Sequence, residues 1–299
     1  MLHKTRFSFF KEFNRQKGVG EPQSFKLNPY ESNPVMQARL DAFLKWAHGE
    51  GVTHPKILYP AFFGEGDAAY PGCLALEDIK EDEIIIRVPG HLVLTAKVAY
   101  YSELHPVFYA HPEIFGRHAS EGEDLMIAAF VLYELQKGEK SFWKPLFDVW
   151  PRGADVLWNW EDEELEELQD ETLVADCESY YKDCMNQWNR MYKVISQYPE
   201  HFKEEFIGFN SFKWIWILLT NRCFSSAWNL TAIVPFAEFL NHENVNVSYD
   251  CLVDGKTRGK EDVQKALAEE ERERLVLRQE LYDSIEKEQG DRREQAEKR

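Results

Sequence analysis

The chain has 299 residues, of which 44% are hydrophobic and 29% charged, a composition typical of a globular protein with a large core. Its formal net charge of −17 argues against a nucleic-acid partner held through phosphate contacts. The longest apolar run, WIWILL, is far shorter than the roughly 20 residues that cross a bilayer, so we expect no membrane partner.

The five cysteines are widely spaced and odd in number, which favours free thiols in a reducing compartment over a disulfide framework. Cys177 and Cys184 lie two helical turns apart, but no second pair of Cys or His has metal-ligand spacing, so we expect buried thiols and no metal site. These features predict a cytoplasmic protein. The basic, aromatic segment 1–18 weakly resembles a mitochondrial transit peptide, which leaves a mitochondrial location as the alternative.

The first third of the chain predicts one helix followed by strands. Residues 1–33 are polar and irregular, and we expect an N-terminal arm. Apolar residues then recur at helical spacing, which predicts an amphipathic helix over 34–49 with Asn33 as its N-cap. Three short apolar runs follow between 57 and 95, separated by turns at Pro-Gly pairs, and each is predicted to be a strand: GCLAL, EIIIRVP and HLVLT.

A long helical insertion is expected at about 97–220. One helix begins at 122, with Gly138 just past its C-terminus, and the aromatic segment 141–151 is expected to cap this region. The acidic segment 160–173 is predicted to be a helix or a helix start, mostly a solvated face.

Two more helices are predicted before the chain returns to strand. Ser211 is expected to cap a helix over 211–224. Residues 175–197 are predicted to be a helix with one apolar stripe, formed by Tyr181, Cys184, Trp188, Tyr192 and Ile195.

The end of the chain predicts a strand and then a charged helix. The alternating run NVNVSYDCLV, 244–253, predicts a strand. Strands on both sides of a helical insertion indicate an α+β domain over 34–255, with a small sheet assembled from distant segments. More than half of residues 260–299 are charged, so 256–299 are predicted to be a helical, solvent-exposed extension that could dock on a protein partner.

Four stretches, in order, carry a resemblance to a known family. They are YPGCLALEDIKEDEIIIRVPGHLVLT, LMIAAFVLYELQKGEKSFWKPLFDVWP, FKWIWILLTNRCF and IVPFAEFLNHENVNVSYD. Together the stretches resemble the SET-domain methyltransferases, in the branch of the plant Rubisco large-subunit methyltransferase and the actin-histidine methyltransferase. The resemblance implies the SET fold, in which a small-strand β-fold is interrupted by a helical insertion.

The resemblance also implies a site for S-adenosyl-L-methionine. A guanidinium is a bidentate partner for the carboxylate of this cofactor, and amide groups can serve its adenine. The residues carried over by position are Asn241, His242, Arg222, Asn221, Glu238, Phe239, Leu240, Ala69, Tyr70, Pro71 and Gly72. Simpler interpretations stay open at this point: Asn241-His242 as a plain loop, Arg222 as an ion-pair partner of Glu238, and 70–72 as no more than a turn.

Two functions follow from the resemblance. The first is S-adenosylmethionine-dependent N-methylation of lysine, or with less support histidine, in a non-histone protein. The second is a catalytically inactive SET-like module that serves as a structural or interaction subunit. The family's tyrosine in a Y-G motif has no match after Cys251, so the C-terminal part of the SET domain is expected to be lacking and the catalytic residues stay unassigned.

Overall fold

The computed structural model describes residues 34–63, 70–116, 118–151, 156–224, 230–242, 251–253 and 256–258. The predicted N-terminal arm, the Asn33 cap, Ala69 and the 260–299 helix lie outside these residues, as do 244–250 of the predicted closing strand. The chain divides into two compact units. One unit holds 1–224 and 230–243, and the other holds 225–229 and 244–299.

Helix α2 (Pro34–Gly49) confirms the predicted first helix. Leu40, Phe43 and Ala47 are buried on one face, because residues three and four apart share a side of an α-helix. This face packs against α7 (Lys144–Val149), a short helix where the sequence indicated only a capping segment.

In the part of the chain that the structure describes, the sheets are three small two-stranded ladders. Strand β1 (Ile57–Phe63) pairs antiparallel with β2 (Tyr70–Ala75), in the register Ile57 opposite Ala75 and Phe63 opposite Tyr70. Strand β3 (Leu94–Thr95) pairs antiparallel with β4 (Ala232–Ile233) and so joins the two sides of the helical insertion. In the second unit, β5 (Cys251–Val253) pairs antiparallel with β6 (Lys256–Arg258).

Two of the predicted strands are largely wrong. The run EIIIRVP is not a strand, and its one β contact with the described residues is an isolated antiparallel bridge between Arg87 and Thr53. In HLVLT only Leu94 and Thr95 are strand, because η3 (Gly90–Leu92) turns the chain in a 3-10 helix first. Apolar β-branched residues fit a strand, but a strand also needs a partner along its length. Among the described residues, EIIIRVP has a partner only at Arg87, and HLVLT only at Leu94 and Thr95.

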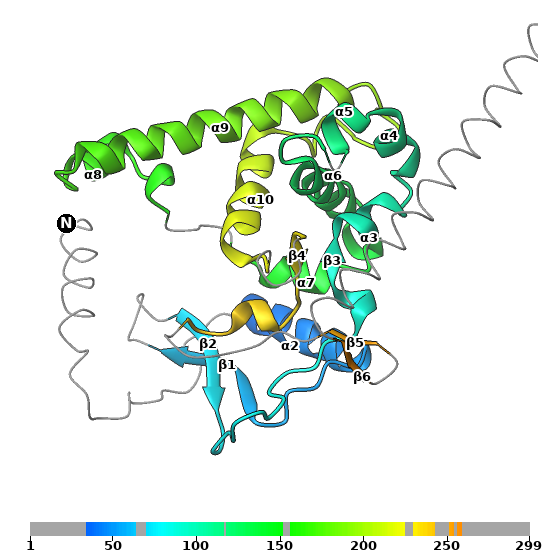
Figure 1. Cartoon of the computed structure of the whole chain (residues 1–299), viewed down its shortest axis with the longest axis vertical. Helices are drawn as coiled ribbons and strands as arrows, with labels where there is room; N and C mark the ends of the chain where they lie inside the picture. The colour runs from blue at the N-terminus through cyan, green and yellow to red at the C-terminus, as the bar shows by residue number, and fades with distance from the viewer. Residues whose placement is uncertain are drawn as a thin grey trace, which may run out of the picture. The chain divides into compact units, whose positions relative to one another are not determined.

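The helical insertion forms the larger part of the core (Figure 1). Helix α6 (Gly122–Gln136) is buried around most of its circumference, with α3, α5, α9 and α10 packed against it. It begins at 122 as predicted, and Gly138 follows its end in the left-handed conformation, with φ at 55°. The other helices of the insertion are α3 (Ala96–Tyr100), α4 (His105–Ala110), α5 (Pro112–Phe115), η4 (Gly138–Lys140), η5 (Leu157–Asn159), α8 (Asp162–Glu166), α9 (Glu171–Ile195) and α10 (Phe209–Arg222).

The acidic segment and α9 differ in detail from the sequence prediction. The acidic segment is divided, because α8 ends at Glu166 and Gln169 takes a positive φ before α9 begins. Tyr181 and Tyr192 are 40% and 38% exposed, so they are not part of the buried stripe. The buried stripe is rotated slightly around the helix axis relative to the predicted one. It consists of Cys177, Cys184, Trp188, Met191, Val194 and Ile195.

Helix α10 starts earlier than predicted. Its N-cap is Gly208, and Ser211 lies inside the helix, so the Ser211 cap is wrong. Phe212, Ile215 and Leu219 are buried as expected, whereas Trp216 is half-buried. No helix among the described residues is long and apolar enough to span a bilayer.

Candidate functional site

Some of the predicted site residues lie where β2, the end of α10 and the turn η6 (Ala237–Phe239) come together. The backbone N–H of Cys73, in β2, donates a hydrogen bond of 2.8 Å to Oδ1 of Asn241. The Cys73 thiol lies 3.5 Å from the carbonyl oxygen of Phe239, as a weak donor. Two segments 168 positions apart in the sequence are therefore tied together at the Asn-His pair.

Gly72 is where these segments approach most closely. A Cβ at this position would lie 2.8 Å from Nδ2 and 2.9 Å from Cγ of Asn241, and closer still to Oδ1. Real Cβ atoms essentially never come under 3.0 Å from such atoms, so a side chain at 72 would displace the amide. The Gly72 position is therefore more than a turn, because its lack of a side chain lets the Asn241 amide reach the backbone of β2.

Arg222, in the last turn of α10, meets the same segment from the other side. Its Nη1 donates to the carbonyl oxygen of Glu238 at 3.5 Å, and the centre of its guanidinium lies 5.5 Å from the Phe239 ring centroid. Arg222 of α10 therefore contacts residues 238 and 239, and Asn241, two residues further along the same segment, bonds β2.

An aromatic cluster holds this segment in place. The Phe239 ring stacks on Tyr59 with centroids 4.6 Å apart, and Phe43 of α2 meets it edge-on at 5.4 Å. Phe236, fully buried, takes a φ of 71° just before η6 and packs edge-on against Tyr59. Because a non-glycine residue seldom adopts such a φ, the surrounding packing must hold it there.

The carboxyl group of Glu238 is turned inward. Trp150, which follows α7, donates through Nε1 to Oε1 of Glu238 at 3.1 Å. Oε2 is buried and has no hydrogen-bond partner among the described residues. Burial raises the pKa of Glu238 to about 7, and the positive charge of Arg222 opposes that rise. Arg222 bonds the main-chain oxygen of Glu238 and no direct ion pair between the two side chains is formed, so the simple pairing considered from the sequence is not what the structure has.

The remaining predicted residues contribute less to this geometry. Asn221 directs its Nδ2 to the carbonyl of Ile217, 2.7 Å away within α10. His242 is exposed, and Leu240 is half-buried. Tyr70 and Pro71 lie in β2, opposite Phe63 and Phe62.

Two residues of the site were not predicted from the sequence. Cys73 contributes its backbone N–H and Trp150 its indole N–H. Cys73 follows Gly72 directly, so its position was available from the sequence. Trp150 lies 88 positions from Glu238, and no local pattern indicates that pairing.

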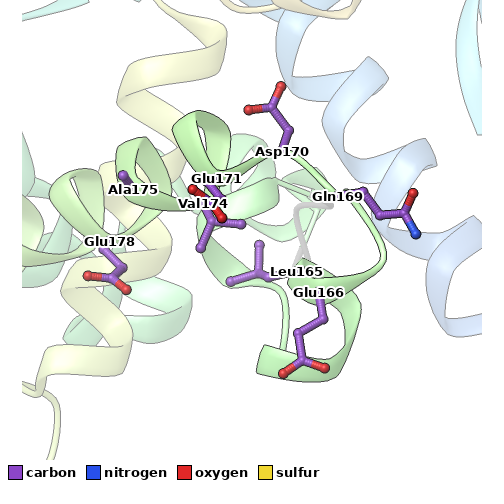
Figure 2. Close-up of a pocket in the computed structure, with 8 residues that line it drawn as sticks. All are labelled: Leu165, Glu166, Gln169, Asp170, Glu171, Val174, Ala175 and Glu178. Carbon is purple, nitrogen blue, oxygen red and sulfur yellow. The ribbon is translucent and has the colours of Figure 1, made fainter.

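Two surface hollows lie elsewhere and include none of these residues. One, of about 440 Å³, lies between α8 and the start of α9, and Figure 2 shows acidic side chains around Leu165 and Val174 there. The other, of about 480 Å³, lies between α2 and α7, with Lys144 and Asp148 on its wall. Among the residues that the structure describes, no group of three or more His, Cys, Asp or Glu could hold a metal ion.

Comparison with known proteins points to one kind of relative. No family model matches the chain. It is 27% identical over 213 residues to the Rubisco large-subunit N-methyltransferase of Pisum sativum, a match that covers 71% of this chain and 40% of that protein. It is 27% identical over 209 residues to the actin-histidine N-methyltransferase of Mus musculus, covering 67% of this chain and 34% of that protein.

Solved structures agree with these relatives. The SET domain of LSMT bound to lysine and AdoHcy superposes with a TM-score of 0.60 at 24% identity, over 73% of this chain and 46% of that one. Rubisco LSMT bound to sinefungin and monomethyllysine gives a TM-score of 0.57 at 27% identity, over 71% of this chain and 45% of that one. The α+β SET fold predicted from the sequence is confirmed, and the chain spans less than half the length of the relatives it matches.

Proposed function

We propose that this chain, as a relative of the SET-domain methyltransferases, binds S-adenosyl-L-methionine beside residues 238–242 and methylates a side-chain nitrogen of a protein. The observation that carries the proposal is that Arg222 of α10 and Cys73 of β2 both contact one short segment, 238–241, which includes Asn241. Relatives named for methylating Rubisco and actin, and solved structures that hold AdoMet or AdoHcy, support it. Because the chain matches only part of each relative, the activity of the whole protein is part of the proposal.

The donors present fit such a cofactor. Among the described residues Arg222 makes one hydrogen bond, at the long distance of 3.5 Å, so most of its five N–H donors can turn to a carboxylate. Asn241 bonds Cys73 through Oδ1, which leaves Nδ2 to donate, and the exposed imidazole of His242 lies next to it. The cofactor supplies a methyl group on a sulfonium; Arg222 would hold its carboxylate, and Asn241 and His242 its other polar groups.

The chain itself must align the target amine with the methyl group of the cofactor and must remove water from that amine. Methyl transfer to an amine is an in-line displacement, so alignment supplies much of the rate. A target lysine has an ordinary pKa of about 10.4 and must lose its proton first, which an apolar channel favours by penalising the charged form. Histidine, with an ordinary pKa of about 6.5, is largely neutral already. We propose lysine as the first target and histidine as the second.

Calorimetry with S-adenosylmethionine tests the cofactor site. We expect Asn241→Ala and Arg222→Ala to weaken binding by about tenfold or more, since each removes one hydrogen-bonding or charged partner of the ligand. Asn186→Ala is the matched control, because Asn186 is exposed on α9 and should leave affinity unchanged. Equal affinity in all four proteins would remove these residues from the site.

A transfer assay tests the chemistry. Radiolabelled cofactor, the full chain and a cell lysate should give one or more labelled proteins, and acid hydrolysis should place the label on lysine. A label on histidine would select the second target. Absence of binding at millimolar cofactor would overturn the proposal. Binding without transfer would favour the inactive module, for which the relatives offer no support.

Other predictions from the sequence remain predictions. The comparisons and the described residues give no indication of a nucleic-acid or membrane partner. The cytoplasmic location, the mitochondrial alternative and partner docking through 260–299 rest on the sequence alone.

A further inference from the structure

Glu238 has an arrangement that a purely structural residue would not need. Its carboxyl group receives one hydrogen bond, from Trp150 Nε1, while Oε2 is buried with no partner among the described residues. A buried carboxylate with so little solvation is costly, and taking up a proton removes most of that cost. The ionised form therefore depends strongly on any nearby positive charge.

Arg222 is the cation that provides this charge. Its guanidinium already contacts the main-chain oxygen of Glu238, and its charge favours the ionised carboxyl against the effect of burial. Burial, the charge of Arg222 and the hydrogen bond from Trp150 together leave the pKa of Glu238 at about 7, so a modest change in the charge of Arg222 alters the protonation of Glu238 near neutral pH.

We propose that Glu238 takes up a proton from solvent when an anionic group, in the proposed function the carboxylate of S-adenosylmethionine, pairs with Arg222. This inference rests on the proposed function. The bound anion offsets the guanidinium charge, so the carboxyl loses the interaction that kept it ionised. Linkage requires the reverse as well: protonation of Glu238 strengthens binding of the anion by the same factor. Glu238 is a positioning residue in this scheme, because it acts through Arg222.

The other titratable groups around Glu238 are few. Cys223, which follows α10, interacts with Glu238, and Cys73 of β2 contacts the carbonyl oxygen of Phe239. Burial raises the pKa of the Cys73 thiol to about 12 and that of Cys223 higher still, so both stay neutral near pH 7. From α6, Asp124 interacts with Cys223, and on the same segment as Glu238, His242 is exposed. Asp124 and His242 are therefore the groups that the experiment must separate from Glu238.

Calorimetry in buffers of different ionisation enthalpy measures proton uptake directly. At pH 7, phosphate and Tris buffers should give different binding enthalpies for S-adenosylmethionine with the full chain, corresponding to about half a proton taken up per cofactor. Glu238→Gln should lose this contribution. The ligand's own ionisable groups contribute equally to both proteins and cancel in the comparison. The affinity of the wild type relative to Glu238→Gln should rise about three- to tenfold as the pH falls from 8 to 6.

Three further variants make the assignment specific. Asp124→Asn and His242→Gln should each retain the buffer dependence, whatever their affinity. Trp150→Phe removes the hydrogen bond to Oε1 and should move the pH of greatest proton uptake upward, which a merely structural role would not do. It also provides a second readout if Glu238→Gln folds poorly.

The outcomes separate this inference from the proposed function. Cofactor binding with the same buffer dependence in wild type and Glu238→Gln overturns the proton-uptake proposal alone. Loss of the dependence in His242→Gln or Asp124→Asn, and not in Glu238→Gln, assigns the proton elsewhere and also overturns it. No heat of binding in any of the proteins overturns the proposed function, and this proposal with it.

Discussion

At Gly72 the backbone of β2 passes so close to the Asn241 amide that a methyl group does not fit between them. The Asn241 side chain is already committed through Oδ1 to the Cys73 N–H. Anything that moves this side chain breaks that hydrogen bond and turns Nδ2 away from the position proposed for the cofactor. The approach of Gly72 to the Asn241 amide is therefore sensitive to substitution at position 72.

We expect Gly72→Ala to lower the free energy of unfolding by about 1–2 kcal/mol and to weaken cofactor binding, because the new Cβ displaces Asn241. Thermal melts and calorimetry measure the two effects. Gly90→Ala is the matched control, since nothing lies within 4 Å of a Cβ at position 90. If the double variant with Asn241→Ala is no more stable than Gly72→Ala alone, the clash is not with this amide.

Glu238 predicts a pH dependence of stability. Burial raises its pKa to about 7, so the folded chain binds this proton more tightly than the unfolded chain. The stability that protonation provides is present below the ordinary glutamate pKa and is lost as the pH rises towards 7. We expect Glu238→Gln to raise the free energy of unfolding by at most about 3 kcal/mol at pH 8, with little effect near pH 5.

Urea unfolding at the two pH values measures this difference. Glu204→Gln is the control. Because Glu204 is exposed, its substitution should have the same small effect on the free energy of unfolding at both pH values. A gain at pH 5 as large as that at pH 8 would mean that the charge of Glu238 is not what makes its burial costly.

Among the elements, helix α6 is followed closely by a glycine whose backbone conformation can be tested. Gly138 follows it with φ at 55°, and a Cβ there would meet nothing within 4 Å, so the conformation itself is what favours glycine. We expect Gly138→Ala to cost about 1 kcal/mol of stability and Gly138→Asn less, measured by thermal denaturation. Gly49→Ala, at the end of α2, is the comparison: a Cβ there has equal space and the φ of Gly49 is not positive, so the substitution should be neutral or mildly stabilising.

A helix of this chain could be predicted from the sequence where the spacing of its own apolar residues is sufficient to define it. The 34–49 helix and the start of α6 follow from local apolar spacing, and the glycine after α6 from its cap preference. EIIIRVP is as apolar as a strand, but the chain places only Arg87 against a partner. Whether a strand forms depends on a distant segment, which local pattern does not specify.

The same division applies to the site. The resemblance assigned Arg222 and Asn241 to one site, and in the structure Arg222 contacts residues 238 and 239 of the segment to which Asn241 belongs. It did not predict that Asn241 would be held by a backbone N–H of β2, or that Trp150 would hold the Glu238 carboxyl. Such pairings depend on how β2, α7 and α10 pack around η6 in three dimensions.

At the scale of the whole molecule, the site draws on segments from β2 to η6 that only the folded chain brings together. A ligand that binds there and not to the unfolded chain stabilises the fold by about 2.7 kcal/mol at a hundred times its Kd. We therefore expect saturating S-adenosylmethionine to raise the Tm by about 5 °C for a chain of this size. Adenosine, which lacks the carboxylate, should raise it less, and the double variant Arg222→Ala with Asn241→Ala should show no shift with either compound. An equal shift with both compounds in the wild type would separate Arg222 from ligand binding, and an undiminished shift in the double variant would place the ligand elsewhere on the molecule.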